Sequence, residues 1–138
     1  MSDSTFRDSA VCMAEENPKV LLVDDDPDML DVLDTAMQSL GFETILARDG
    51  DEGWDAFQRH KPRLVISDIY MPRKNGVVLL DQIKENNYDT VVILITGYAH
   101  FRQLMAHSRF PPDGFINKPF NLKDLVNSIQ QAYKSENH

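Results

Sequence analysis

Two hydrophobic patterns alternate along the chain from Lys19 onward. Short apolar runs occur at residues 20–23, 43–47, 63–67, 91–96 and 114–117. Three of these runs, VLLV, RLVIS and VVILIT, are continuous rather than alternating, as is typical of parallel strands that are buried on both faces. The pattern therefore predicts five short strands that belong to a parallel sheet.

Segments with helical spacing lie between and after these runs. Pro27 near the start of the first segment and Gly41 just past its end are typical boundary residues of a helix. The apolar positions that mark the five helices are Leu30, Leu33, Met37 and Leu40, then Trp54 and Phe57, then Leu79, Leu80 and Ile83, then Phe101, Leu104 and Met105, and finally Leu122, Leu125, Val126, Ile129 and Tyr133. Five strands alternating with five helices predict a doubly wound α/β fold, in which ligands bind beyond the carboxyl ends of the strands.

The composition of the 138-residue chain fits one globular domain, with 42% hydrophobic and 26% charged residues. The formal net charge is -8, which argues against non-specific binding to nucleic acid or to anionic lipid. The same charge is compatible with binding divalent cations or basic surfaces of partner proteins.

The N-terminal segment, residues 1–18, has little apolar periodicity and is expected to form a flexible tail ahead of a domain at residues 19–136. It has no basic region followed by an apolar core, so it does not resemble a signal peptide. The only cysteine, Cys12, rules out an internal disulfide and fits a reducing compartment. No apolar run approaches the length of a membrane span. We therefore expect a cytoplasmic protein.

Polar residues collect where the predicted strands end. These residues are Asp24, Asp25 and Asp26 after the first run, Asp68 after the third, Thr96 at the end of the fourth and Lys118 after the fifth. Because the carboxyl ends of parallel strands share one edge of the sheet, these side chains are expected to converge. Two carboxylates about 5 Å apart repel by about 3 kcal/mol at an effective dielectric constant of about 20. Lys118 can neutralise one charge, and a hard divalent cation such as Mg²⁺ can neutralise more.

Such a site is suited to phosphoryl transfer. Asp68 would attack phosphorus and form an aspartyl phosphate. Mg²⁺ and Lys118 would stabilise the charge on the equatorial phosphoryl oxygens, and the hydroxyl of Thr96 would donate a hydrogen bond to one of them.

Four motifs carry a resemblance to a known family. VLLVDDDP, LVISDIYMPRKNG, ILITGYA and FINKPF occur in an order and spacing that resemble the receiver domain of two-component response regulators, of the CheY-like single-domain type. The resemblance covers about residues 19–134. It implies a five-stranded parallel sheet with the strand order 2-1-3-4-5 and five helices.

The resemblance also implies the metal ligands. Asp24 and Asp25 match the acidic pair that binds Mg²⁺, one directly and one through water, with Asp25 as the direct ligand. Asp68 matches the phosphorylated aspartate, which also contacts the metal, and the backbone carbonyl of Tyr70 matches a further ligand. Asp26 matches a peripheral acidic position.

Three further positions match the catalytic and switch residues of the family. Lys118 and Thr96 match the lysine and the hydroxyl residue that contact the phosphoryl group, and Phe115 matches the aromatic switch residue. On phosphorylation, Thr96 would move toward the phosphoryl oxygen and Phe115 would turn inward. The Lys118–Pro119 bond matches a family position that is often cis.

The implied partner is a sensor histidine kinase or a histidine phosphotransfer protein, which would donate the phosphoryl group to Asp68. The implied output is a change in protein contacts on the face formed by the fourth helix, the fifth strand and the fifth helix. The resemblance implies no enzymatic activity beyond phosphorylation and dephosphorylation of the domain itself. It implies no direct binding to nucleic acid or membrane and is compatible with a homodimer.

Some positions depart from the common pattern of the family. Pro111 and Pro112 stand where a turn of small residues is usual, so we expect the fourth helix to end by Phe110 and the next loop to be stiff. These prolines lie on the usual output face, so a generic mode of dimerisation need not apply. Tyr70 and Tyr98 are bulky residues that flank Asp68, and we expect them to slow hydrolysis of the acyl phosphate.

Other functions fit the motifs less well. Phosphohydrolases that form an aspartyl phosphate typically need a second aspartate two residues after the nucleophile, where this chain has Tyr70. A flavodoxin-like cofactor site would need hydrogen-bond donors after the first strand, where DDDPD would repel a phosphate. A calcium loop that starts at Asp24 would need Gly and Glu where the chain has Met29 and Thr35. A degenerate receiver that takes no phosphate is disfavoured by the complete set of site residues.

Simpler roles stay open for single residues. Asp24 and Asp25 can cap the helix that begins near Pro27, and Phe115 can be an ordinary core residue. The chain can be a single-domain regulator or the receiver part of a hybrid kinase or longer regulator. The sequence does not identify the cognate kinase, the output partner or the oligomeric state.

Overall fold

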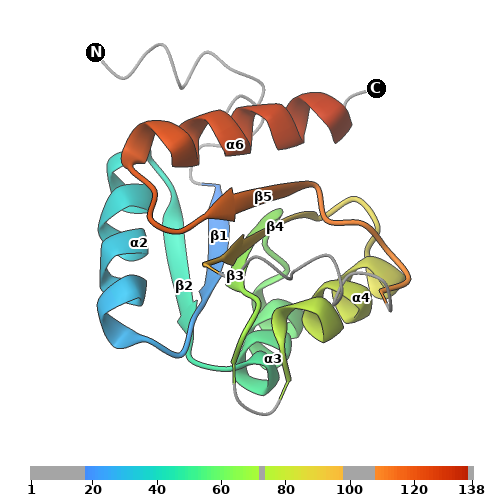
Figure 1. Ribbon diagram of the computed structural model, residues 1–138. Helices are drawn as coiled ribbons and strands as arrows, with labels where there is room; N and C mark the ends of the chain where they lie inside the picture. Colours follow the sequence, from blue (N-terminus) through green and yellow to red (C-terminus); the bar gives the residue numbers. More distant parts are fainter. Residues whose placement is uncertain (1–17, 72–73, 98–107, 137–138) are drawn as a thin grey trace.

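The computed structural model describes residues 18–71, 74–97 and 108–136, which form alternating strands and helices (Figure 1). The strands are β1 (Lys19–Val23), β2 (Glu43–Ala47), β3 (Leu64–Asp68), β4 (Val91–Thr96) and β5 (Gly114–Asn117). The helices are α2 (Pro27–Ser39), α3 (Gly50–His60), α4 (Gly76–Asn86) and α6 (Leu122–Glu136). The segments predicted as a flexible tail and as the fourth helix, with Phe101, Leu104 and Met105, lie outside the described residues apart from Pro18 and residues 108–110.

All five strands are parallel and form one sheet in the order β2-β1-β3-β4-β5. This arrangement confirms the predicted doubly wound α/β fold and its strand order. The bounds of all five strands agree with the prediction within one residue at each end; β1 begins one residue earlier, and β3 is displaced by one residue, so that it ends on Asp68 itself. Residues 108–113 form neither helix nor strand, as expected of the segment that contains Pro111 and Pro112.

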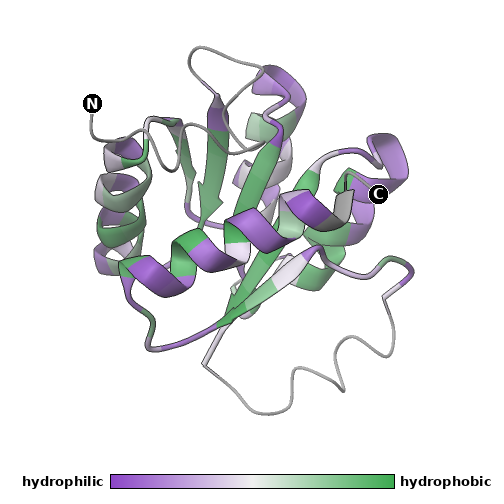
Figure 2. Ribbon diagram, turned by 90° about the horizontal axis from the view of Figure 1, so that it is seen from above, coloured by the Kyte–Doolittle hydropathy of each residue, from purple (hydrophilic) through white to green (hydrophobic). Residues whose placement is uncertain are grey.

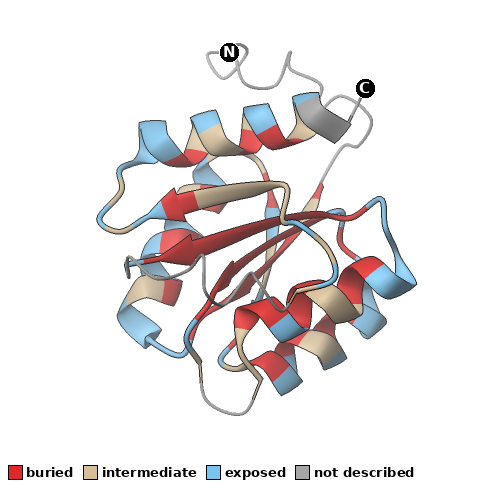
Figure 3. Cartoon of the chain, turned by 45° about the vertical axis from the view of Figure 1, so that its right-hand side comes forward, coloured by how far each residue is buried: buried red, intermediate tan, exposed pale blue. Residues whose placement is uncertain are grey.

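Helices cover both faces of the sheet, with α2 and α6 on one face and α3 and α4 on the other (Figures 1 and 2). Residues of β1 alternate between the two sides: Val20 and Leu22 pack with α2 and α6, whereas Leu21 and Val23 pack with α3 and α4. Such packing explains why the central strands are continuously apolar, because both of their faces are buried (Figure 3).

Asparagine and aspartate side chains start three helices directly after the loops that follow the strands. Asp26 accepts a hydrogen bond from the backbone of Asp28 at the start of α2, and Asp49 and Asn75 cap α3 and α4 in the same manner. The end of α2 is followed by Gly41, whose φ of 95° suits a glycine. The described residues include no helix that is both apolar and long enough to cross a membrane.

Candidate functional site

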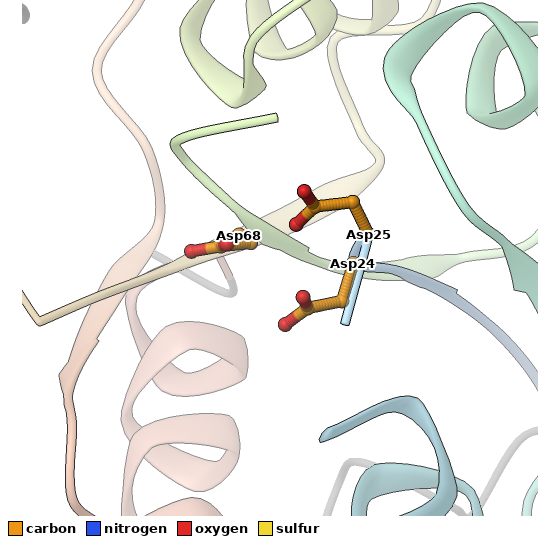
Figure 4. A group of neighbouring side chains, drawn as sticks. All are labelled: Asp24, Asp25 and Asp68. Carbon is orange, nitrogen blue, oxygen red and sulfur yellow. The ribbon is translucent and has the colours of Figure 1, made fainter. Parts of the chain in front are cut away.

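Three aspartates from two neighbouring strands point into the same space beyond the carboxyl ends of the sheet (Figure 4). Asp24 directly follows β1, and Asp68 is the last residue of β3, which pairs with β1. One carboxylate oxygen from each of Asp24, Asp25 and Asp68 lies within 4.8 Å of the others. The predicted convergence of acidic residues at this edge of the sheet is therefore observed.

Asp24 is completely buried, and its two carboxylate oxygens have different surroundings. Oδ1 accepts a hydrogen bond of 2.9 Å from the backbone of Asp26. Oδ2 is buried and accepts no hydrogen bond from any described residue. Burial is the main cause that raises the pKa of Asp24, because a buried carboxylate lacks the water that stabilises its charge. An oxygen in this position is suited to a cation.

Asp68 is also buried, with 7% of the residue exposed. Its Oδ1 atom accepts a hydrogen bond of 3.0 Å from the backbone of Ile69 and lies 3.5 Å from Nζ of Lys118. Burial, followed by repulsion from Asp24, raises the pKa of Asp68 to about 6, against the lowering effect of Lys118. The Asp68 carboxylate is therefore still mainly ionised near neutral pH.

Lys118, which directly follows β5, brings a positive charge to this acidic cluster. Its Nζ atom lies 3.8 Å from Oδ2 of Asp24 in addition to its contact with Asp68. The backbone nitrogen of Lys118 donates to the carbonyl of Thr96, which is buried at the end of β4, over 2.9 Å. The bond from Lys118 to Pro119 is cis, as the family pattern suggested. The acidic cluster and Lys118 thus come from the ends of β1, β3 and β5, and the backbone of Lys118 is bonded to the end of β4.

The donor set fits a hard divalent cation. Three carboxylates against one ammonium group leave two negative charges in excess, and carboxylate oxygens are preferred ligands of Mg²⁺. The buried Oδ2 atom of Asp24 gives this fit an independent support, since it has no hydrogen-bond donor among the described residues. Asp25 is exposed, which leaves its carboxylate accessible from solvent.

The remaining predicted residues lie around this centre. Tyr70, two residues after Asp68, is 36% exposed. Phe115 on β5 is half-buried and packs against the apolar cluster between the sheet and the helices α3 and α4. Tyr98 lies outside the described residues. The cap of α2 is Asp26, so the alternative reading of Asp24 and Asp25 as the capping residues is wrong.

Two residues next to Asp68 had not been assigned a role from the sequence. The hydroxyl of buried Ser67 donates to the backbone carbonyl of Asp68 over 2.9 Å. Gly76 lies so close that a Cβ atom there would overlap the same carbonyl oxygen. Gly76 ends the motif LVISDIYMPRKNG, but neither contact has a signal in hydrophobic periodicity, because both depend on how the chain folds back after β3.

A family model described as "Response regulator receiver domain" matches residues 20–130. The chain belongs to this family. Receiver domains are phosphoacceptor switches of two-component signalling, so the function inferred from the four motifs is confirmed at that level.

Curated relatives and solved structures agree with this assignment. A probable C4-dicarboxylate response regulator of Priestia megaterium, DctR, is 33% identical over 84% of this chain and 51% of its own length. The probable transcriptional regulator ycf27 of Porphyridium aerugineum is 27% identical over 86% of this chain and 49% of its own length. The chain thus spans about half the length of such relatives.

Among solved structures, TrrA of Thermotoga maritima, in a complex with Mg(2+)-BeF, superposes with a TM-score of 0.76 at 30% identity. That match covers 83% of this chain and 98% of TrrA. The receiver domain of NtrX from Brucella abortus matches with a TM-score of 0.75 at 30% identity, over 84% of this chain and 98% of its own.

Proposed function

We infer that Asp68 is the phosphoacceptor of a receiver that takes its phosphoryl group from a sensor histidine kinase or a histidine phosphotransfer protein. The observation that carries this proposal is the position of Lys118, whose ammonium group faces both Asp68 and the buried Asp24. A nucleophilic carboxylate, an acidic neighbour that can hold a cation and a lysine that can contact a phosphoryl oxygen are the parts that the reaction needs.

Mg²⁺ is the proposed metal. Asp24, Asp25, Asp68 and the backbone carbonyl of Tyr70 would hold it, and when bound it supplies positive charge that offsets the negative charge of the phosphoryl oxygens. Support comes from the buried Oδ2 atom of Asp24, which accepts no hydrogen bond from the described residues, and from the fit of the carboxylate set. The similar structure of TrrA, which contains Mg(2+)-BeF, is in line with this choice.

In the proposed transfer, a carboxylate oxygen of Asp68 attacks the phosphorus atom of a phosphohistidine. A new O–P bond forms, the P–N bond to the imidazole breaks, and the departing imidazole nitrogen takes a proton. The nucleophile must be ionised, and a pKa of about 6 leaves Asp68 mainly ionised at neutral pH. Lys118 then contacts a phosphoryl oxygen, and the hydroxyl of Thr96 donates a hydrogen bond to another.

The proposed output is a change in surface contacts. Movement of Thr96 toward the phosphoryl group would allow Phe115 on β5 to turn inward, which alters the face formed by β5, α6 and the segment between β4 and β5. Support comes from the half-buried state of Phe115, next to the apolar cluster that could receive it. A downstream protein, in some cases a second copy of the chain, is proposed to bind this face.

The remaining parts of the proposal concern the location of the protein in the cell, the contacts and reactions that are not expected, and the rate of hydrolysis. A cytoplasmic location and the absence of direct contacts to nucleic acid or membrane follow from the sequence and stay predictions. So does the restriction of chemistry to phosphorylation and dephosphorylation of the domain itself. Tyr70 is proposed to slow hydrolysis of the acyl phosphate, and its position beside Asp68 in sequence and its partial exposure are compatible with that role.

The direct test is the mass of the intact protein after incubation with acetyl phosphate, with and without Mg²⁺. We expect the wild type to gain one phosphoryl group only when Mg²⁺ is present, and Asp68→Asn to gain none, because an amide is not a nucleophile. Asp89→Asn, at an exposed position, is the matched control and should be phosphorylated like the wild type. Equal incorporation into Asp68→Asn would refute the assignment. Incorporation into no variant, together with no stable beryllofluoride complex, would indicate a degenerate receiver.

A further inference from the structure

The loop after β3 carries the Tyr70 carbonyl that we propose as a metal ligand, and it is held at two places. At its start, Ile69 is completely buried and donates its backbone N–H to Ile95 of β4 over 3.1 Å. At its end, the backbone of Gly76 donates to the carbonyl of Ile69 over 2.8 Å, which closes the loop into a ring. Tyr70 and Lys74 both lie within this ring.

Lys74 anchors the ring to two helices at once. Its Nζ atom donates to the side-chain oxygen of Gln82 on α4 and lies 3.6 Å from Oδ1 of Asp51 on α3. Only 17% of the Lys74 side chain is exposed, although lysine is among the residues least often found buried. The partly buried stem and two polar contacts give this lysine a defined position.

The backbone of Lys74 also packs closely against the first residue of α3. Gly50, the first residue of α3, lies so close that a Cβ atom there would overlap the carbonyl oxygen, carbonyl carbon and Cβ of Lys74. No positive φ is associated with Gly50, so the reason for glycine here is space rather than backbone conformation. The N-terminus of α3 and the loop after β3 are therefore in direct backbone contact.

We propose that Lys74 is a positioning residue for the metal site, which it serves by holding the end of the loop at Gly76 against Ile69 and Asp68, next to the Tyr70 carbonyl. This inference rests on the proposed function, since it concerns the same site. Lys74 would not touch the metal or the phosphoryl group; it acts through Gly76 and the backbone of Asp68 and Ile69. Residues that hydrogen-bond a metal ligand directly change metal affinity by about 10- to 100-fold when they are removed, and Lys74, which contacts no proposed ligand through its side chain, is expected at the lower end of that range.

Positioning and charge predict opposite results for Lys74→Met. Loss of a positive charge near an acidic site would tighten the binding of a cation, whereas loss of a positioning contact would weaken it. Gln82→Leu separates the two effects further, because it removes the acceptor of Lys74 and keeps the charge. Lys134→Met, an exposed lysine in the last turn of α6, is the matched control for loss of one positive charge.

The test is calorimetric titration of the full-length, metal-free protein with Mg²⁺, together with the melting temperature in the absence of metal. We expect Lys74→Met and Gln82→Leu to bind Mg²⁺ roughly tenfold more weakly than the wild type, Lys74→Arg to lie in between, and Lys134→Met to be unchanged. The melting temperature without metal is expected to fall by a few degrees at most, since Gln82→Leu loses one partly exposed hydrogen bond and Lys74→Met loses that bond and one largely exposed ion pair.

Unchanged Mg²⁺ affinity in both Lys74→Met and Gln82→Leu would overturn the positioning role, and so would tighter binding in Lys74→Met. In these cases the wild type still binds Mg²⁺ and still accepts a phosphoryl group on Asp68, so the proposed function survives. A wild type that binds no Mg²⁺ would overturn both. The two failures are therefore distinguishable in one set of titrations.

Discussion

The Nζ atom of Lys118 lies 3.5 Å from Oδ1 of Asp68, although the two residues are 50 positions apart in the sequence (118 − 68 = 50). The same ammonium group lies 3.8 Å from the buried Oδ2 atom of Asp24. Among the described residues, Lys118 is thus the cation that opposes several carboxylates at the site, and this balance leads to measurable consequences for pKa, stability and metal binding.

The first prediction concerns the stability of Asp68→Asn without metal. Because burial raises the pKa of Asp68 to about 6, the folded protein keeps a proton that the unfolded chain releases between about pH 4 and pH 6. The ionised carboxylate therefore destabilises the fold above pH 6, by up to about 3 kcal/mol, and this cost disappears as the pH falls below about 4. Asp68→Asn should be more stable than the wild type near pH 7.

Urea denaturation in EDTA at several pH values checks this prediction. The difference in the free energy of unfolding between Asp68→Asn and the wild type should shrink as the pH falls from about 7 to about 4. The exposed-site variant Asp89→Asn should differ from the wild type by a small and nearly constant amount. A difference for Asp68→Asn that does not change with pH would contradict the raised pKa of Asp68.

A second prediction concerns Lys118→Met. Lys118 lowers the pKa of Asp68, so its removal should move that pKa above about 6. The backbone N–H of Ile69 donates to Oδ1 of Asp68, which makes the Ile69 amide a reporter of this titration. In NMR titrations of the metal-free protein, the inflection at Ile69 should occur at higher pH in Lys118→Met. An inflection at the wild-type pH would mean that the ammonium group has little influence on Asp68.

A third prediction concerns stabilisation by Mg²⁺. Binding to the folded state alone stabilises it by mass action, by about 2.7 kcal/mol at a metal concentration of about one hundred times Kd. The melting temperature of the wild type should therefore rise with Mg²⁺, and that of Asp24→Asn should rise much less at the same concentrations. Thermal scans with Mg²⁺ and with an equal ionic strength of NaCl make the comparison. Equal shifts in both salts would argue against a specific site.

A fourth prediction concerns a buried ion pair that lies away from the acidic site. Nζ of Lys84 lies 2.8 Å from Oδ2 of Asp113 and donates to the backbone carbonyls of Tyr88 and Thr90. The Lys84 side chain is 2% exposed, so Lys84→Met leaves a carboxylate without its ionic partner and should cost about 3 kcal/mol of stability.

The ion pair joins α4 to the segment before β5, at the opposite ends of the strands from Asp68. Phosphorylation of Asp68 by acetyl phosphate should therefore persist in Lys84→Met at temperatures where the variant is folded. The double variant Lys84→Met/Asp113→Asn should recover part of the lost stability, because the unpaired charge is gone. Chemical denaturation of the wild type, Lys84→Met and the double variant measures these differences. No recovery of stability in the double variant, or loss of phosphorylation in folded Lys84→Met, would contradict this account.

Much of the fold could be predicted because its patterns are local. The runs at β1, β3 and β4 are continuously apolar since these strands are buried on both faces, and the alternation with helical spacing specifies the α/β class. The site residues could also be placed, because the carboxyl ends of parallel strands meet at one edge. The displacement of β3 by one residue could not be predicted, since Arg63 and Asp68 are both polar ends of the same apolar run.

The contacts around the loop after β3 could not be predicted in the same way. The approaches of Gly50 to Lys74 and of Gly76 to Asp68 join residues from separate elements. Sequence alone gives each of these glycines several possible explanations, such as a turn, a helix end or a close approach. Only the packing of α3 and α4 on the sheet selects the last of them.

The pair Asp24 and Asp25 separates the two kinds of information most clearly. The sequence by itself determined that carboxylates follow a central strand and meet Asp68 and Lys118 at the edge of the sheet. The tertiary structure alone decided that Asp24 is completely buried, with one oxygen that accepts no hydrogen bond from the described residues, whereas its identical neighbour Asp25 is exposed. The physical reason is that the burial of a side chain depends on the elements packed around it, which a local sequence pattern does not specify.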